Sequence, residues 1–84
     1  MSILTITDGR REWRMGGNLH RADGPAIERA NGTREWWVDG KRHRADGPAV
    51  EWASGLRMWY VFGEERTQEQ VELAVASLRR IIRR

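Results

Sequence analysis

The stretch HRADGPA occurs twice in the chain, at residues 20–26 and again at residues 43–49. When the 84-residue sequence is laid on itself at the same offset of 23 residues, the match extends on both sides of the stretch. Trp13, Trp36 and Trp59 align, and a glycine aligns four residues before and four residues after each tryptophan. The sequence therefore predicts about two and a half structural repeats over residues 1–66.

Each repeat carries a turn signal. The turns are TDGR at 7–10, ANGT at 30–33 and ASGL at 53–56. Asp-Gly and Asn-Gly are strong signals for a two-residue β-hairpin loop. Loops of two residues would pair Leu4 with Trp13, Ile27 with Trp36 and Val50 with Trp59. We therefore expect about three consecutive antiparallel β-hairpins in a twisted sheet, with this aliphatic–tryptophan face as the core.

The opposite face of the predicted hairpins changes along the chain. The same pairing places on this face Glu12 and Arg14 in the first hairpin, Glu28, Glu35 and Trp37 in the second, and Met58, Tyr60 and Phe62 in the third. This face becomes more apolar toward the C-terminus, where we expect another element to cover it.

Residues 67–84 change to a helical pattern. Thr67 and Gln70 have the spacing of a capping box, in which each side chain bonds the other residue's backbone N–H. The apolar positions Val71, Ala74, Val75, Leu78, Ile81 and Ile82 follow one helical face. The predicted fold is thus mainly β with one C-terminal α-helix (α+β). A single domain would span residues 1–84, with hairpin repeats over 1–66 and an amphipathic capping helix over about 68–82.

Composition excludes several classes of protein. The chain has no cysteine, so disulfides and cysteine zinc sites are excluded. No apolar run approaches the roughly 20 residues of a membrane helix, and the first ten residues do not resemble a signal peptide. We expect a cytoplasmic protein, in the host cytoplasm if a phage encodes it.

The repeated loop itself combines backbone signals with two polar side chains. Asp46 favours a turn, Gly47 allows positive φ, and Pro48 favours the start of a strand. The set His20, Asp23, His43 and Asp46 would be the candidate for a metal or acid–base site, but no third ligand type or nucleophile accompanies it. We expect a scaffold role, no enzyme activity, no metal and no cofactor. Any function in the loop would reside in its His-Arg half.

The motif WWVDGKRHRADGPAVEWASG, at residues 36–55, resembles the MORN repeat, in particular the MORN-like variants of bacterial and phage proteins. The matching positions include Trp36, Gly40, His43 and the DGPA stretch 46–49. The first copy differs by Arg14 in place of the second aromatic residue, and the third lacks the DGPA loop. The resemblance covers about residues 4–66 and implies consecutive antiparallel hairpins. About function it implies interaction with another molecule.

Charge and residue type favour a binding protein. The net charge is +3, and every basic residue except Lys41 is arginine. Trp and Arg dominate interface hot spots, so we expect a non-enzymatic protein-binding module. We expect a phage or mobile-element inhibitor that blocks a host macromolecular complex, of an anti-defence or anti-CRISPR-like type. The alternative is a nucleic-acid-binding protein that uses its arginine-rich surface.

The partner would be a protein or a nucleoprotein complex. Direct contact with nucleic acid remains open, membrane binding is disfavoured, and the oligomeric state is not specified by the sequence. The candidate partner-binding residues are Arg14, Trp37, Lys41, Arg42, Arg44, Tyr60, Arg79, Arg80, Arg83 and Arg84. For Trp37 and Tyr60, burial beneath the helix is the competing interpretation.

Overall fold

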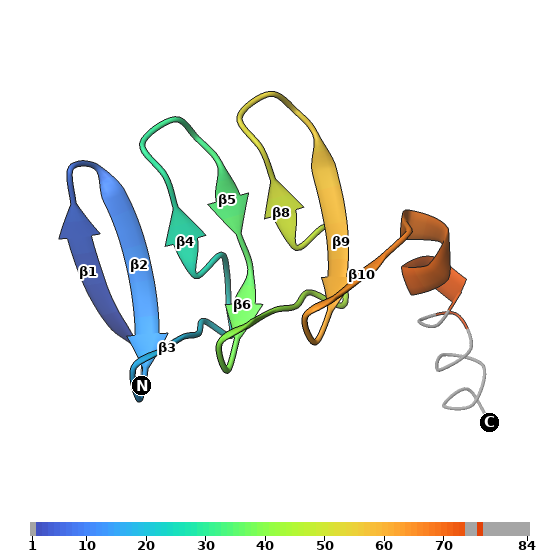
Figure 1. Cartoon of the computed structure of the whole chain (residues 1–84), viewed down its shortest axis with the longest axis horizontal. Coiled ribbons are helices and arrows are strands. Elements are labelled where there is room, and N and C mark those ends of the chain that lie inside the picture. The colour runs from blue at the N-terminus through green and yellow to red at the C-terminus, as the bar shows by residue number, and fades with distance from the viewer. Residues whose placement is uncertain (1, 74–75, 77–84) are drawn as a thin grey trace.

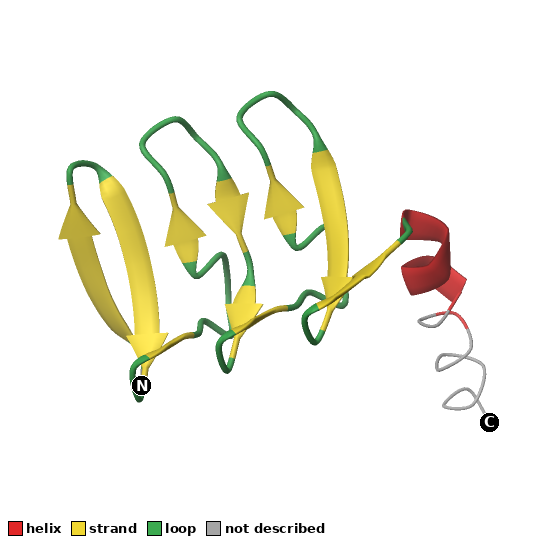
Figure 2. Cartoon of the chain, viewed as in Figure 1, coloured by secondary structure: helices red, strands yellow, loops and turns green. Residues whose placement is uncertain are grey.

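The computed structural model describes residues 2–73 and 76. Within them the protein is mainly antiparallel β-sheet with one short C-terminal helix, as predicted (Figures 1 and 2). The strands are β1 (Ile3–Thr7), β2 (Arg10–Met15), β3 (Asn18–Leu19), β4 (Ile27–Glu28), β5 (Arg34–Glu35), β6 (Trp37–Val38), β7 (Lys41–Arg42), β8 (Val50–Glu51), β9 (Arg57–Val61) and β10 (Glu64–Arg66).

The main sheet is ordered β1-β2-β4-β5-β8-β9-β10, and β3 pairs with β2 beside this path. Strands β6 and β7 form a separate two-stranded ladder. Figure 1 shows the antiparallel pairs β1–β2, β4–β5 and β8–β9 side by side, with the loops that join each pair at one end and the helix beyond β10. Neighbours in sequence are therefore neighbours in space.

Backbone hydrogen bonds recur along the sheet at the offset seen in the sequence. The Trp13 N–H donates to the Ala26 carbonyl, and the Trp36 N–H donates to the Ala49 carbonyl. The N–H groups of Arg21 and Arg44 likewise donate to the carbonyls of Trp37 and Tyr60. Residues 23 apart thus make equivalent contacts with the following strands.

The pairing register matches the prediction in the first hairpin only. Leu4 lies opposite Trp13, which confirms the Asp8–Gly9 loop of two residues. Ile27, however, pairs with Glu35, and Val50 pairs with Met58, one residue away from the predicted tryptophans.

Loop conformation explains the shift of register. Asp8 and Gly9 both have positive φ, as a two-residue type I′ loop requires. In the second and third loops only Gly32 and Gly55 have positive φ. The Gly32 N–H donates to the Arg29 carbonyl, and the Arg29 N–H donates to the Thr33 carbonyl, so three residues close the turn. One additional loop residue moves the pairing by one position.

The core consequently differs from the predicted aliphatic–tryptophan face. Leu4 is 44% exposed, and Trp13, Trp36 and Trp59 are only half-buried. The buried residues among those described are Ala26, Ile27, Thr33, Glu35, Ala49, Val50 and Val71. Because Glu35 lies opposite both Ile27 and Val50, the predicted placement of Glu35 outside the core is wrong.

The helix begins after Thr67 and covers residues 68–73 and 76 of the described chain. The capping box is confirmed, since the Gln70 N–H donates to Thr67 Oγ1 and the Thr67 N–H donates to Gln70 Oε1. Val71 is 6% exposed and lines one cavity together with Trp59 and Pro48. The rest of the predicted helix, to residue 82, lies outside the described residues. No helix in the described part is long and apolar enough to cross a membrane.

Candidate interaction surface

The two histidines of the repeated loop each accept a hydrogen bond from a backbone N–H of a later turn. His20 Nδ1 accepts a hydrogen bond of 3.0 Å from the backbone N–H of Asp39. His43 Nδ1 accepts one of 3.0 Å from the N–H of Phe62. Asp39 and Phe62 both have positive φ and begin the tight turns that follow β6 and β9. Each histidine therefore ties its loop to the turn of the following unit.

The two arginines of the loop stack on tryptophans. The guanidinium carbons of Arg21 and Arg44 lie 4.0 Å from the ring centroids of Trp13 and Trp36 respectively. Each arginine also bonds its own loop: Arg44 donates to Asp46 at 3.0 Å and to the Pro48 carbonyl at 3.1 Å. The His-Arg half of the loop, which the sequence left without a full explanation, thus has a structural role in both copies.

The glycines of the loop serve a different purpose from the one predicted. Neither Gly24 nor Gly47 is among the described residues with positive φ. Instead, a Cβ atom at Gly47 would lie 2.8 Å from Arg44 Cζ, and one at Gly24 would lie 3.0 Å from Arg21 Cζ. Glycine suits these positions because the guanidinium passes directly over the backbone, and a Cβ atom would make the arginine side chain shift.

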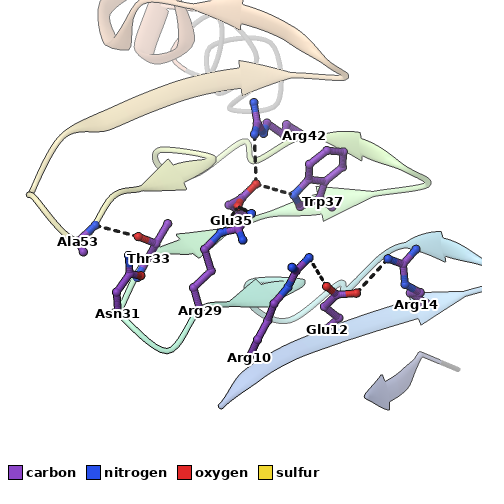
Figure 3. Close-up of polar contacts among 10 residues, drawn as sticks. All are labelled: Arg10, Glu12, Arg14, Arg29, Asn31, Thr33, Glu35, Trp37, Arg42 and Ala53. Atoms are coloured by element: carbon purple, nitrogen blue, oxygen red, sulfur yellow. Dashed lines mark hydrogen bonds and ion pairs between the residues drawn. The ribbon is translucent and has the colours of Figure 1, made fainter. Parts of the chain in front are cut away.

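A buried carboxylate on β5 gathers arginine and tryptophan side chains around it (Figure 3). Glu35 is 1% exposed and accepts hydrogen bonds from Arg29, Trp37 and Arg42. Burial raises the pKa of Glu35, but the hydrogen bonds from Arg29 and Trp37 and the charges of Arg29 and Arg42 outweigh it. The pKa of Glu35 therefore lies below its ordinary value.

Three of the candidate residues meet at Arg42, which bonds this carboxylate. The guanidinium carbon of Arg42 lies 5.3 Å from the ring centroids of both Trp37 and Tyr60. All three side chains are half-buried. The cavity that the described helix residues line includes Trp59 but neither Trp37 nor Tyr60.

The other candidates are dispersed. Arg14 lies on β2 and pairs with Glu12, which Arg10 also contacts (Figure 3). Lys41 is exposed in the β6–β7 ladder, and Arg44 is held by its loop and by Glu51. Arg79, Arg80, Arg83 and Arg84 lie outside the described residues. The structure thus brings the side chains of Trp37, Arg42 and Tyr60 together, whereas the side chains of Arg14 and Arg44 form ion pairs with other carboxylates.

The sequence prediction did not include an exposed apolar group at the tip of the β8–β9 hairpin. Trp52 and Leu56 close the loop, joined by a bond from the Trp52 N–H to the Leu56 carbonyl. Trp52 is 36% exposed and Leu56 is 60% exposed. The indole N–H of Trp52 donates to Met58 Sδ at 3.4 Å, which places Met58 in the same group. We call Trp52, Leu56 and Met58 the tip cluster.

A sequence signal for the tip cluster does exist. At the equivalent position of the preceding repeat, Arg29 stands where Trp52 stands, and Arg29 turns inward to the buried Glu35. The third hairpin has Met58 in place of Glu35, and Trp52 therefore has no carboxylate to bond. The replacement of an ion pair by a Trp–Met pair marks this hairpin as different.

Comparison of the chain with protein-family models, with curated proteins and with solved structures gave no match.

Proposed function

We propose that the chain is a non-enzymatic protein-binding module built from MORN-like repeats, and that the tip cluster is the centre of its binding surface. The observation that supports this proposal most is the exposure of Trp52 and Leu56, which lie opposite each other at the end of the β8–β9 hairpin. Large apolar side chains that remain exposed together on a small protein are typical of interaction sites. Tryptophan is also the residue type most enriched among interface hot spots.

The surroundings of the tip cluster suit a protein partner. Met58 continues the group toward the middle of β9, and Tyr60 with Arg42 follows two residues further on. A partner that covers the tip cluster would meet an apolar centre and an arginine–aromatic rim, which is the usual composition of a protein–protein interface. The biological setting that we propose is a small basic inhibitor, of phage or mobile-element origin, that occupies a surface of a host complex.

Binding to nucleic acid receives less support from the described arginines. Arg14 is paired with Glu12, Arg42 with Glu35, and Arg44 with Asp46 and Glu51. A phosphate would have to compete with these carboxylates for each guanidinium. We therefore expect weak binding to duplex or single-stranded DNA at low salt. A submicromolar affinity that collapses as salt is added would contradict the proposal.

Site-specific photocrosslinking tests the proposal directly. A photoreactive amino acid is placed at Leu56 and, as the matched control, at Asp23, whose side chain is 86% exposed in a loop of the first repeat. In extract of the native host, the probe at residue 56 should give a discrete protein adduct that unlabelled wild-type chain suppresses. Adducts of equal yield from both positions would show that the tip cluster is not the binding surface.

A further inference from the structure

Strand β1 forms one edge of the main sheet. It pairs with β2 on one side, and the strand order ends with it on the other (Figure 1). All five of its residues are exposed, and Ile3 and Ile6 are 70% and 61% exposed. An exposed edge of this kind presents unpaired backbone groups along an apolar strand.

The direction of those groups follows from the contacts of β2. The Trp13 N–H donates to the Ala26 carbonyl, and the Trp13 carbonyl accepts from the His20 N–H, so both groups of Trp13 point away from β1. Backbone groups alternate in direction along a strand, so those of Glu12 and Arg14 point toward β1 and meet Thr5 and Ile3. Leu4 and Ile6 therefore direct their N–H and C=O groups outward.

The two edges of the sheet differ in how they resist pairing. Strand β10, at the opposite edge, consists of Glu64, Glu65 and Arg66, and such charges on an edge strand oppose association. Strand β1 reads Ile-Leu-Thr-Ile-Thr and contains neither a charge nor a proline. Of these two edges of the described main sheet, β1 has the properties of a pairing surface.

We propose that a second copy of this chain binds along β1, strand to strand and antiparallel, with the two-fold axis at Thr5. In this register Leu4 of one copy lies opposite Ile6 of the other, and each such pair exchanges two backbone hydrogen bonds. The outward groups of Leu4 and Ile6 are thereby satisfied in both copies. The site lies on the hairpin farthest along the sheet order from the tip cluster, and the proposal does not depend on the proposed function.

The side chains of β1 are complementary to themselves in this arrangement. Leu4 and Ile6 lie on one face of the strand, so the two copies would bring four aliphatic side chains together there. On the other face Thr5 meets Thr5 of the second copy, and no like charges are brought into direct opposition. A two-fold contact between identical edges closes after two subunits, whereas pairing β1 with β10 would continue as a filament.

Cysteine crosslinking tests the register of the dimer. The chain contains no cysteine, so a single introduced thiol reports on one position only. Thr5 on the axis would form a non-hydrogen-bonded pair with its own copy, with Cα atoms about 4.5 Å apart, within disulfide range. In Thr5→Cys, oxidised glutathione should convert two thiols to one intermolecular disulfide, about tenfold faster than in Thr7→Cys, whose thiols face Ile3 of the other copy. Equal rates for the two variants would overturn the proposal.

A proline substitution tests the backbone pairing. The Ile6 N–H points outward, so Ile6→Pro removes a donor that the single chain does not use. The wild-type chain should sediment at high micromolar concentration with a mass approaching twice 9.8 kDa, and Ile6→Pro should remain at the monomer mass with an unchanged β circular-dichroism spectrum. A wild-type chain that stays monomeric, or a folded Ile6→Pro chain that dimerises equally well, would overturn the proposal.

Discussion

His43 Nδ1 accepts a hydrogen bond of 3.0 Å from the backbone N–H of Phe62, and the two rings stack with their centroids 4.0 Å apart. His20 accepts the same kind of bond from the N–H of Asp39, and both of these residues lie 23 positions before their counterparts His43 and Phe62. Each histidine side chain thus accepts a hydrogen bond from the first residue of a tight turn with positive φ, 19 residues further along the chain. The repeated histidine is part of the structural connection between units.

The histidine bond predicts a specific stability loss. His43→Ala should lower the free energy of unfolding by about 1–2 kcal/mol, because the Phe62 N–H loses its acceptor in a turn with positive φ. Chemical denaturation measures this change. His43→Asn is the matched control, since its side-chain oxygen can take the place of Nδ1, and it should restore part of the loss. Equal losses in both variants would mean that ring packing, and not the hydrogen bond, is what stabilises the turn.

The close approach of Arg44 to Gly47 predicts coupling between the two positions. Gly47→Ala should displace the guanidinium from Trp36 and lower the free energy of unfolding by about 1 kcal/mol. In an Arg44→Ala background the same glycine change should have little effect, because the clashing group is absent. A double-mutant cycle by urea denaturation measures the coupling. Additive losses would show that Gly47 is required for its backbone conformation alone.

The sequence predicted the first hairpin and the capping box because each depends on local signals. Asp8-Gly9 allows positive φ at both loop positions, and Thr67 with Gln70 has a fixed spacing. The register of the later hairpins was wrong because Asn31 and Ser54 do not adopt the left-handed conformation, and a third loop residue is needed to close each turn. When a loop has three residues and not two, every cross-strand residue pair of that hairpin moves by one position.

The error in register also hid the buried carboxylate and part of the candidate surface. Moving the pairing by one residue places Glu35 opposite Ile27, inside the sheet. The buried charge of Glu35 is tolerated because Arg29 and Arg42 both bond it. These arginines lie six and seven residues from Glu35 in the sequence, and no local sequence pattern predicts that they converge on it. For the same reason Trp52, the counterpart of Arg29, was not recognised as exposed.

The lowered pKa of Glu35 predicts a pH dependence of stability. In the unfolded chain this carboxyl titrates near its ordinary pKa of 4.5, and in the folded chain at a lower pH. Its ionised form therefore contributes stability that is fully present above about pH 4.5 and is lost as the pH falls through the folded-state pKa. Thermal unfolding between neutral and acid pH measures this loss.

Two variants separate Glu35 from the other carboxylates. Glu35→Gln should lose about 2 kcal/mol of stability at neutral pH and should show a weaker dependence on acid pH than the wild type. The exposed Glu65 provides the matched control, and Glu65→Gln should leave the pH profile unchanged. A Glu35→Gln chain with the wild-type profile would exclude Glu35 as the source of acid sensitivity.

The burial of Val71, in a cavity that Trp59 also lines, predicts that the helix depends on one side chain. Val71→Asp should detach the helix from Trp59, because a charge would have to be buried beside the ring. Tryptophan emission should shift to longer wavelength, with a loss of helical circular dichroism. Leu73 is 61% exposed on the same helix, and Leu73→Asp should change neither signal. If Val71→Asp leaves both signals unchanged, the helix does not pack on the sheet through this residue.

We propose that the repeated loop supports the fold and that the tip cluster binds the partner. Isothermal titration calorimetry with the crosslinked partner, once purified, tests it most directly. The Trp52→Ala/Leu56→Ala variant should bind at least tenfold more weakly, because hot-spot residues contribute about 2 kcal/mol or more. Asp46→Ala, which alters the repeated loop at an exposed side chain, should bind within about twofold of wild type. Unchanged affinity in the tip variant together with a large loss in Asp46→Ala would contradict the account and return the function to the loop.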